Sequence, residues 1–195
     1  MKLPFNAYTF VRVSVMRSTL LKPEEYKKML KMSFAEIAEA LRQSNYKQEI
    51  EHLGLRLSGA ALLEHALNEN LKKTYEKLLR VSDENMQKVI NAYLLRNDFH
   101  NVKTILRSKV TSLSEQEMKD LFLPGTISNI DALMKKDTIS DVLKSSNLVS
   151  PDFLKQAKKV ENNLIKLENL LDKEYFLRMK DFAATLENGK VMKEF

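Results

Sequence analysis

The chain has 195 residues, of which 44% are hydrophobic and 30% charged, a balance typical of a folded globular protein and not of a disordered one. It contains no cysteine, which excludes disulfide scaffolds, thiol nucleophiles and Cys-ligated metals and fits a reducing cytoplasm. Four glycines and four prolines are too few for a β-sandwich or barrel, which need frequent turns. We therefore expect an all-α fold built from long helices.

The stretch from Phe5 to Leu21 is apolar but lacks the pattern of a signal peptide. Arg12 and Arg17 interrupt it, and no small-residue cleavage site follows. No run of about 18 uncharged apolar residues, the length of a membrane-spanning helix, occurs in the sequence. We therefore expect no transmembrane segment.

The first predicted helices are marked by residues that favour helix starts. Asn6 is placed to cap a helix that runs to about residue 21, and Pro23 opens the next one because proline loses no hydrogen bond in a first turn. Ser33 and Glu36 have the spacing of a capping box for a third helix that ends near Arg42.

A long helix is predicted from about Ser58 to Val81, because apolar residues recur at steps of three and four. The residues on this face are Leu63, Ala66, Leu67, Asn70, Leu71, Thr74 and Leu78. We expect Ser82 to cap the next helix and the pair Asn97 and Asp98 to interrupt it.

A second capping box at Ser114 and Glu117 predicts a short helix. The triplet from Leu123 to Gly125 then predicts a loop, since it contains the dipeptide Pro-Gly, and two short helices are expected after it.

From Pro151 onward the pattern predicts one very long helix. Its apolar positions alternate steps of four and three, as in a coiled coil, and are Phe153, Ala157, Val160, Leu164, Leu167 and Leu171. No later segment could cover this helix, so the end of the chain has the character of an unfinished domain. We divide the chain at residue 150, into 1–150 and a long helix within 151–195.

The sequence offers little chemistry. His52, His65 and His100 fall on separate predicted elements, and no Gly-x-Ser-x-Gly or Gly-rich phosphate loop is present. His65 and Glu69 share a helix face, but we interpret them as a solvated flank and not as metal ligands. We expect no enzyme activity, no metal and no cofactor.

The densest polar feature is a set of basic residues at steps of four, three and four, namely Arg96, His100, Lys103 and Arg107. On a continuous helix they form one basic ridge beside an apolar stripe. The ridge could face acidic groups of a partner. Alternatively, it could pair with carboxylates of adjacent helices in the same chain, with Asp98 as a helix cap.

The stretch that contains this ridge, LLRNDFHNVKTILRSK at residues 94–109, resembles the signature of the C subunit of the archaeal-type (A/V-type) ATP synthase, a relative of the d subunit of the V-ATPase. The motif positions are Asp98, His100, Asn101, Lys103, Thr104 and Arg107. Val102 stands where the family usually has Leu. The segment from Arg17 to Leu21 and the pair Thr74 and Tyr75 also resemble the family, in the same order.

The resemblance implies a chain built from similar helical repeats arranged as a funnel, with residues 1–150 as the first repeat and 151–195 as the start of a second, incomplete one. Because family members are considerably longer, it implies a fragment. It further implies a non-catalytic central-stalk rotor subunit on the cytoplasmic face of the membrane. Its partners would be the proteolipid ring and the central shaft.

Two other interpretations remain open. The formal charge of +6 would suit a basic all-helical nucleic-acid-binding protein, although no segment carries five or six consecutive like charges and no compact helix-turn-helix is evident. A generic helical adaptor is the other possibility, in which the uncovered stripe between Phe153 and Leu186 pairs with a second copy.

Overall fold

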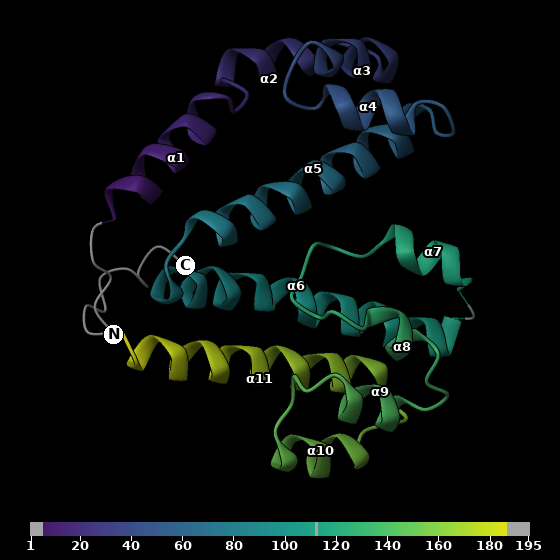
Figure 1. Cartoon of the computed structure of the whole chain (residues 1–195). Helices are drawn as coiled ribbons and strands as arrows, with labels where there is room; N and C mark the ends of the chain where they lie inside the picture. The colour runs from purple at the N-terminus through teal and green to yellow at the C-terminus, as the bar shows by residue number, and fades with distance from the viewer. Residues whose placement is uncertain (1–5, 112, 187–195) are drawn as a thin grey trace. The chain divides into compact units, whose positions relative to one another are not determined.

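The computed structural model describes residues 6–111 and 113–186, and these residues form eleven helices and no strand (Figure 1). The expected all-α fold is thereby confirmed. The helices are α1 (Ala7–Ser18), α2 (Pro23–Met29), α3 (Phe34–Arg42), α4 (Lys47–Leu53), α5 (Gly59–Val81), α6 (Glu84–Thr111), α7 (Glu115–Asp120), α8 (Ile130–Met134), α9 (Ile139–Ser145), α10 (Pro151–Lys158) and α11 (Leu164–Ala184).

The described residues divide into two compact units, 6–87 and 88–186, with the division inside α6. In the first unit α3, α4 and the first half of α5 pack together around a small apolar core. Its buried residues are Ala38, Leu41, Ile50, Leu53, Leu62, Leu63 and Ala66. Beside this core the buried Glu49 accepts hydrogen bonds from Lys73 Nζ at 2.7 Å and Asn70 Nδ2 at 3.3 Å.

Helix α1 begins beside the last turn of α5 (Figure 1). Asn6 caps it as predicted, accepting a hydrogen bond from Thr9 N at 3.1 Å. Thr9 is buried, and its hydroxyl donates to the carbonyl oxygen of Val81. Most apolar residues of α1 are exposed, including Tyr8 and Val11.

Most predicted helix starts are confirmed, with one correction. The capping boxes at Ser33 and Ser114 form as expected. The residue that caps α6, however, is Asp83, whose Oδ1 accepts from Met86 N at 2.9 Å. Ser82 instead ends α5. Ser82 and Asp83 are both good capping residues, and the carboxylate takes the position because α5 continues to Val81.

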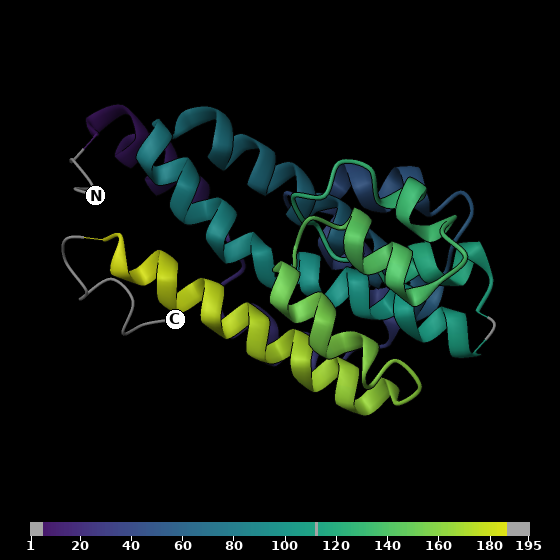
Figure 2. The same ribbon diagram turned by 90° about the horizontal axis from the view of Figure 1, so that it is seen from below.

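In the second unit α6 and α11 lie side by side and run antiparallel (Figures 1 and 2). Helices α8, α9 and α10 pack in succession, and α10 contacts α11. The core of this unit contains Phe99, Val102, Ile105, Leu106, Met118, Leu133, Met134, Val142, Leu143, Leu148, Phe153, Ala157, Leu167 and Leu171. The Phe99 and Tyr175 rings meet edge to face at a centroid distance of 5.7 Å.

The expected interruption at Asn97 and Asp98 is wrong, because α6 runs without a break from Glu84 to Thr111. Asp98 is fully buried in the middle of the helix and is engaged by a distant loop. Its carboxylate therefore neither caps the helix nor competes with the helical backbone.

The expected single helix after Pro151 is also wrong. It divides into α10 and α11, and Asn163 starts α11 by accepting from Lys166 N at 3.0 Å. The predicted apolar stripe nevertheless spans both helices, and it is covered, since Phe153 and Leu171 are buried in the core. The uncovered stripe that we expected is thus absent from the described residues.

Among residues 6–111 and 113–186, no helix combines the length and apolarity that a bilayer crossing requires.

Candidate functional site

The 94–109 stretch lies in the second half of α6, and its polar side chains point to two different neighbours. Asn97, Asp98 and Asn101 face the connection between α7 and α8. Lys103 and Arg107 face α11.

Asparagine side chains on α6 bond the backbone of this connection in the way that a neighbouring strand would. Asn101 Oδ1 accepts from Leu123 N at 2.8 Å, and Asn101 Nδ2 donates to the carbonyl oxygen of Leu123, also at 2.8 Å. One turn earlier, Asn97 Nδ2 donates to the carbonyl oxygen of Pro124 at 2.7 Å. Both backbone polar groups of Leu123, a residue outside any helix, are thereby satisfied.

Asp98 completes this contact. Its Oδ1 accepts from Thr126 N at 2.7 Å and from Ile127 N at 3.2 Å, and its Oδ2 accepts from the Thr126 hydroxyl at 2.5 Å. Burial raises the pKa of the Asp98 carboxyl, and the hydrogen bonds from Thr126 and Ile127 only partly oppose that effect. A fully buried carboxylate that receives three hydrogen bonds is a structural anchor, with no access for a ligand.

Gly125 is required where the loop crosses α6. A Cβ built on this residue would lie 2.1 Å from Asp98 Oδ1 and 3.1 Å from its Cγ. No side chain fits in that space. The loop backbone can therefore come this close to the carboxylate only if residue 125 is glycine.

The two cations of the predicted ridge that face α11 are paired within the chain. Arg107 Nε and Nη2 bind the two carboxylate oxygens of Glu168 at 2.6 and 2.8 Å, and Lys103 Nζ binds Asp172. The alternative of internal pairing therefore describes Lys103 and Arg107.

His100 and Arg96, the other two ridge residues, differ from this pair. His100 is half-buried and lies near the backbone of Leu121, whose contribution to the imidazole pKa is upward but smaller than that of burial. Burial lowers the pKa of the His100 imidazole, and the nearby cations Arg107, Lys103 and Arg96 lower it further. Arg96 is exposed and makes no ion pair or hydrogen bond with another described residue. The remaining motif residue, Thr104, is buried and donates to the His100 carbonyl oxygen at 3.1 Å.

Sequence reasoning missed the loop side of this contact. The Leu-Pro-Gly triplet was predicted to be a loop, but nothing in it indicated that Gly125 and Thr126 would pack on Asp98. The available signal was the motif itself, since a mid-helix Asp with Asn on both sides needs partners for its polar groups.

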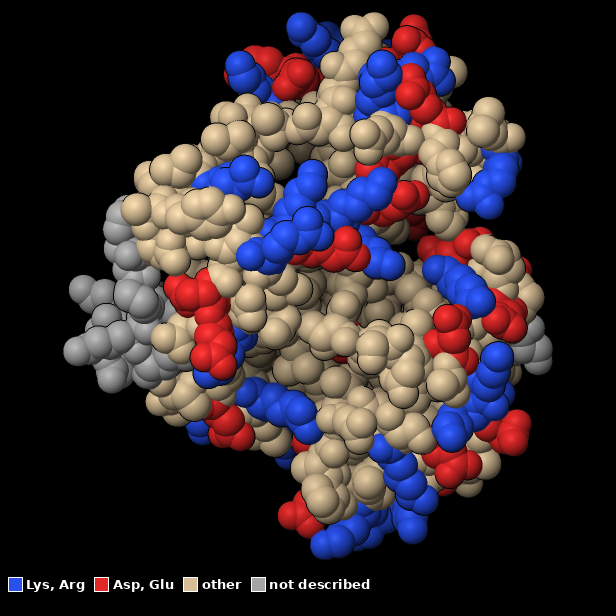
Figure 3. Space-filling model, viewed as in Figure 1, with Lys and Arg blue, Asp and Glu red and all other residues tan. Residues whose placement is uncertain are grey.

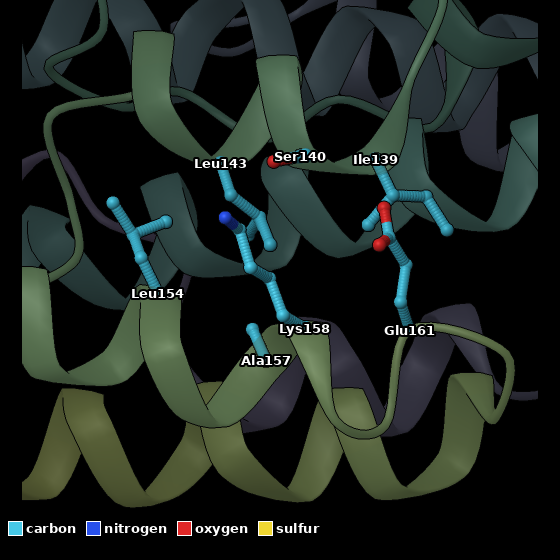
Figure 4. A pocket seen from close by; sticks show the side chains of 7 residues that line it. All are labelled: Ile139, Ser140, Leu143, Leu154, Ala157, Lys158 and Glu161. Carbon is cyan, nitrogen blue, oxygen red and sulfur yellow. The ribbon is translucent and has the colours of Figure 1, made fainter.

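The second unit also contains a shallow pocket, between α9 and α10 (Figure 4). Leu143, Leu154 and Ala157 give it an apolar floor, and the side chains of Lys158 and Glu161 extend along it. It has no convergent polar groups of the kind that orient a cofactor. Among the described residues, no three His, Asp or Glu side chains gather as metal ligands would.

Charges of both signs are mixed on the molecular surface. On the face shown in Figure 3, Lys and Arg side chains lie next to Asp and Glu side chains on both units. Several of these neighbours form ion pairs, such as Lys119 with Glu115 and Lys73 with Glu69.

Comparison with known proteins gives a consistent result. The family model described as ATP synthase (C/AC39) subunit matches residues 10–195. A protein of Methanosarcina acetivorans, named as the C subunit of an A-type ATP synthase, is 37% identical over 182 residues, 91% of this chain and 49% of that protein. Proteins of the same name from Archaeoglobus fulgidus and Haloferax volcanii are 35% and 33% identical, over 92% and 96% of this chain.

The chain spans about half the length of these relatives, with 54% of the Archaeoglobus fulgidus protein and 56% of the Haloferax volcanii protein matched.

Proposed function

This chain belongs to the ATP synthase (C/AC39) subunit family, and we propose that it acts as a non-catalytic central-stalk rotor subunit of an A/V-type ATP synthase or ATPase. The observation that carries the proposal is the match over residues 10–195, together with relatives named as C subunits of A-type ATP synthases. In this role it couples a membrane proteolipid ring to the central shaft during proton or sodium transport, on the cytoplasmic face of the membrane.

The architecture supports a mechanical role. The second unit has a packed core, and two ion-paired contacts join its long helices α6 and α11. Transmission of torque needs a stiff body and broad complementary contact more than a reactive site.

We propose that Arg96 is the residue of the ridge with which this chain contacts an acidic partner surface. Its guanidinium is exposed, whereas Lys103 and Arg107 are engaged by Asp172 and Glu168. His100, half-buried beside the loop, would contribute shape and hydrogen bonding more than charge. An exposed interfacial cation of this kind mainly increases the association rate, and its effect decreases with salt.

A binding experiment tests the proposal. The purified chain would be immobilised and offered proteolipid ring in detergent or a purified protein of the shaft, at low and at near-physiological salt. Capture of either partner is expected. Arg96→Glu should weaken that capture, and Lys88→Glu, an exposed lysine about two turns earlier on α6, is the control because it makes the same charge change. Failure to bind either partner, with salt-sensitive binding to duplex DNA instead, would contradict the rotor role.

We also propose that α11 carries a self-association surface, although not the stripe expected from the sequence. That stripe is buried, whereas Ile165 and Phe176 are 74% and 68% exposed on one side of the helix. Sedimentation of the chain over a range of concentrations would detect a dimer, and Phe176→Asp should abolish it. A monomer at every concentration would contradict this surface.

A further inference from the structure

The connection between α7 and α8 is fastened to α6 through side chains. Five of its backbone groups are bonded by Asn97, Asp98 and Asn101: the N–H groups of Leu123, Thr126 and Ile127 and the carbonyl groups of Leu123 and Pro124. These bonds are neither helical nor part of a sheet. The conformation of residues 121–127 therefore depends on these three side chains, together with Phe122 and Ile127, which are partly buried and pack against the core.

We infer that Asn97, Asp98 and Asn101 form a cooperative latch that holds residues 121–127 against α6 and can open as one unit while the helical core stays folded. Asn97 and Asn101 are one helical turn apart, with Asp98 between them, so all three reach the same loop. Because Gly125 has no Cβ, the Asp98 carboxylate can occupy the space that a side chain at this position would fill.

Cooperativity follows from the short distance between the bonds. Leu123 and Thr126 lie on either side of Gly125, and a Cβ built on Gly125 would lie within 3.5 Å of both Asp98 and Asn101. If Asn101 is lost, the loop can withdraw, and Thr126 and Ile127 then lose their bonds to Asp98 as well. The core residues Val102, Ile105 and Leu106 lie on α6 and share a cluster with residues of α8, α9, α10 and α11, to which the loop adds only the partly buried Phe122 and Ile127, so opening can remain local.

This inference is independent of the proposed role in a rotary complex, because it concerns only the isolated chain. It assigns the Asn-Asp-x-x-Asn part of the 94–109 stretch a structural role within this chain, which is to hold the loop. The exposed face of the loop then has a fixed conformation without any partner.

Native-state hydrogen exchange on the full chain tests the latch. In the wild type, the amides of Leu123, Thr126 and Ile127 should be protected. Asn101→Ala should accelerate their exchange by roughly tenfold or more, including Thr126 and Ile127, which do not bond to Asn101. The amides of Val102–Leu106 should change by much less.

Asn129→Ala is the matched control, because Asn129 lies just after the loop and its side chain makes no capping bond. It should leave loop protection unchanged. Gly125→Ala provides a second variant if Asn101→Ala does not fold, and it should open the same three amides by obstructing Asp98.

Four results would overturn the latch. The loop amides could already exchange at the rate of an unstructured peptide in the wild type. Asn101→Ala could affect Leu123 alone, or it could accelerate the α6 core amides by the same factor as the loop. Unchanged protection in Gly125→Ala would equally contradict it.

Discussion

Arg107 on α6 holds both carboxylate oxygens of Glu168 on α11, at 2.6 and 2.8 Å, across 61 residues of sequence. This bidentate geometry orients the two helices as well as neutralising the charge. The pair is partly exposed, so its contribution to stability is modest and decreases with salt.

A charge exchange at this pair distinguishes internal pairing from partner contact. Arg107→Glu should lower the free energy of unfolding by about 1 kcal/mol, because it places two carboxylates together. The double variant Arg107→Glu/Glu168→Arg should recover most of that loss in urea denaturation. Lys166→Glu, an exposed lysine on α11, is the control and should have little effect. A single variant as stable as the wild type would show that the pair does not hold the helices.

Asp98 should make the protein less stable as the pH rises. Because burial raises the pKa of Asp98 in the folded state above its unfolded value, folding favours the protonated carboxyl. The associated stabilisation is fully present below the unfolded pKa, near about 4, and is lost as the pH increases through the raised folded pKa.

Asp98→Asn should remove this dependence while keeping the loop in place. The amide oxygen can accept from Thr126 N and Ile127 N, and its NH2 group can donate to the Thr126 hydroxyl after that hydroxyl rotates. Denaturation at several pH values should therefore show a flatter profile and a gain relative to the wild type at neutral pH. Asp98→Ala, which leaves the loop amides unpaired, should be destabilised at every pH by about 1–3 kcal/mol. Parallel profiles for wild type and Asp98→Asn would contradict the raised pKa.

Glu49 in the first unit should make the protein less stable as the pH falls, the opposite of the dependence expected from Asp98. Burial would raise its pKa, but the hydrogen bonds from Lys73 and Asn70 outweigh burial, so the pKa of Glu49 is lowered. Its stabilisation is present above the unfolded pKa and is lost as the pH falls through the lowered folded value. Glu49→Gln should reduce stability at neutral pH and weaken the acid dependence. Glu51→Gln, exposed on the same helix, should change stability by less than about 0.5 kcal/mol.

Thr9 should determine whether α1 stays attached to α5. Thr9→Val preserves shape but leaves the Val81 carbonyl oxygen without the hydroxyl that it binds, at a cost of about 1–3 kcal/mol. Amide exchange in α1 should then accelerate, while the core around Ile50 remains protected. Thr19→Val removes a hydroxyl that bonds only to Met16 in the adjoining turn, so it should leave the attachment of α1 unchanged.

Sequence patterns predicted the helix starts well because capping is local. Asn6, Ser33 and Ser114 each bond a residue three positions later, and that spacing is visible in the sequence. The break between α10 and α11 was missed for a related reason. Both helices contribute to one core, so the apolar rhythm from Phe153 to Leu171 continues across the turn.

The orientation of the motif could not be predicted, because its partners are remote. Asp98 bonds residues 28 and 29 positions away, and Lys103 bonds Asp172 at a separation of 69. A helical wheel places the basic residues on one ridge, but only the packed unit shows which of them meet carboxylates. Arg96 and Arg107 look equivalent on the wheel, yet one is exposed and the other is paired.

The separation between α6 and α11 also has a consequence for how the chain acquires its structure. The core of the first unit closes over short distances in sequence, since Glu49 meets Lys73 only 24 positions later. The α6–α11 contacts close loops of 61 and 69 residues. Closing these longer loops costs more conformational entropy, so we expect these contacts to form later than those of the first unit. During synthesis on a ribosome, the core on the apolar side of α6 would stay incomplete until α11 supplies Leu167 and Leu171. That interval is when this unit would most need protection from aggregation.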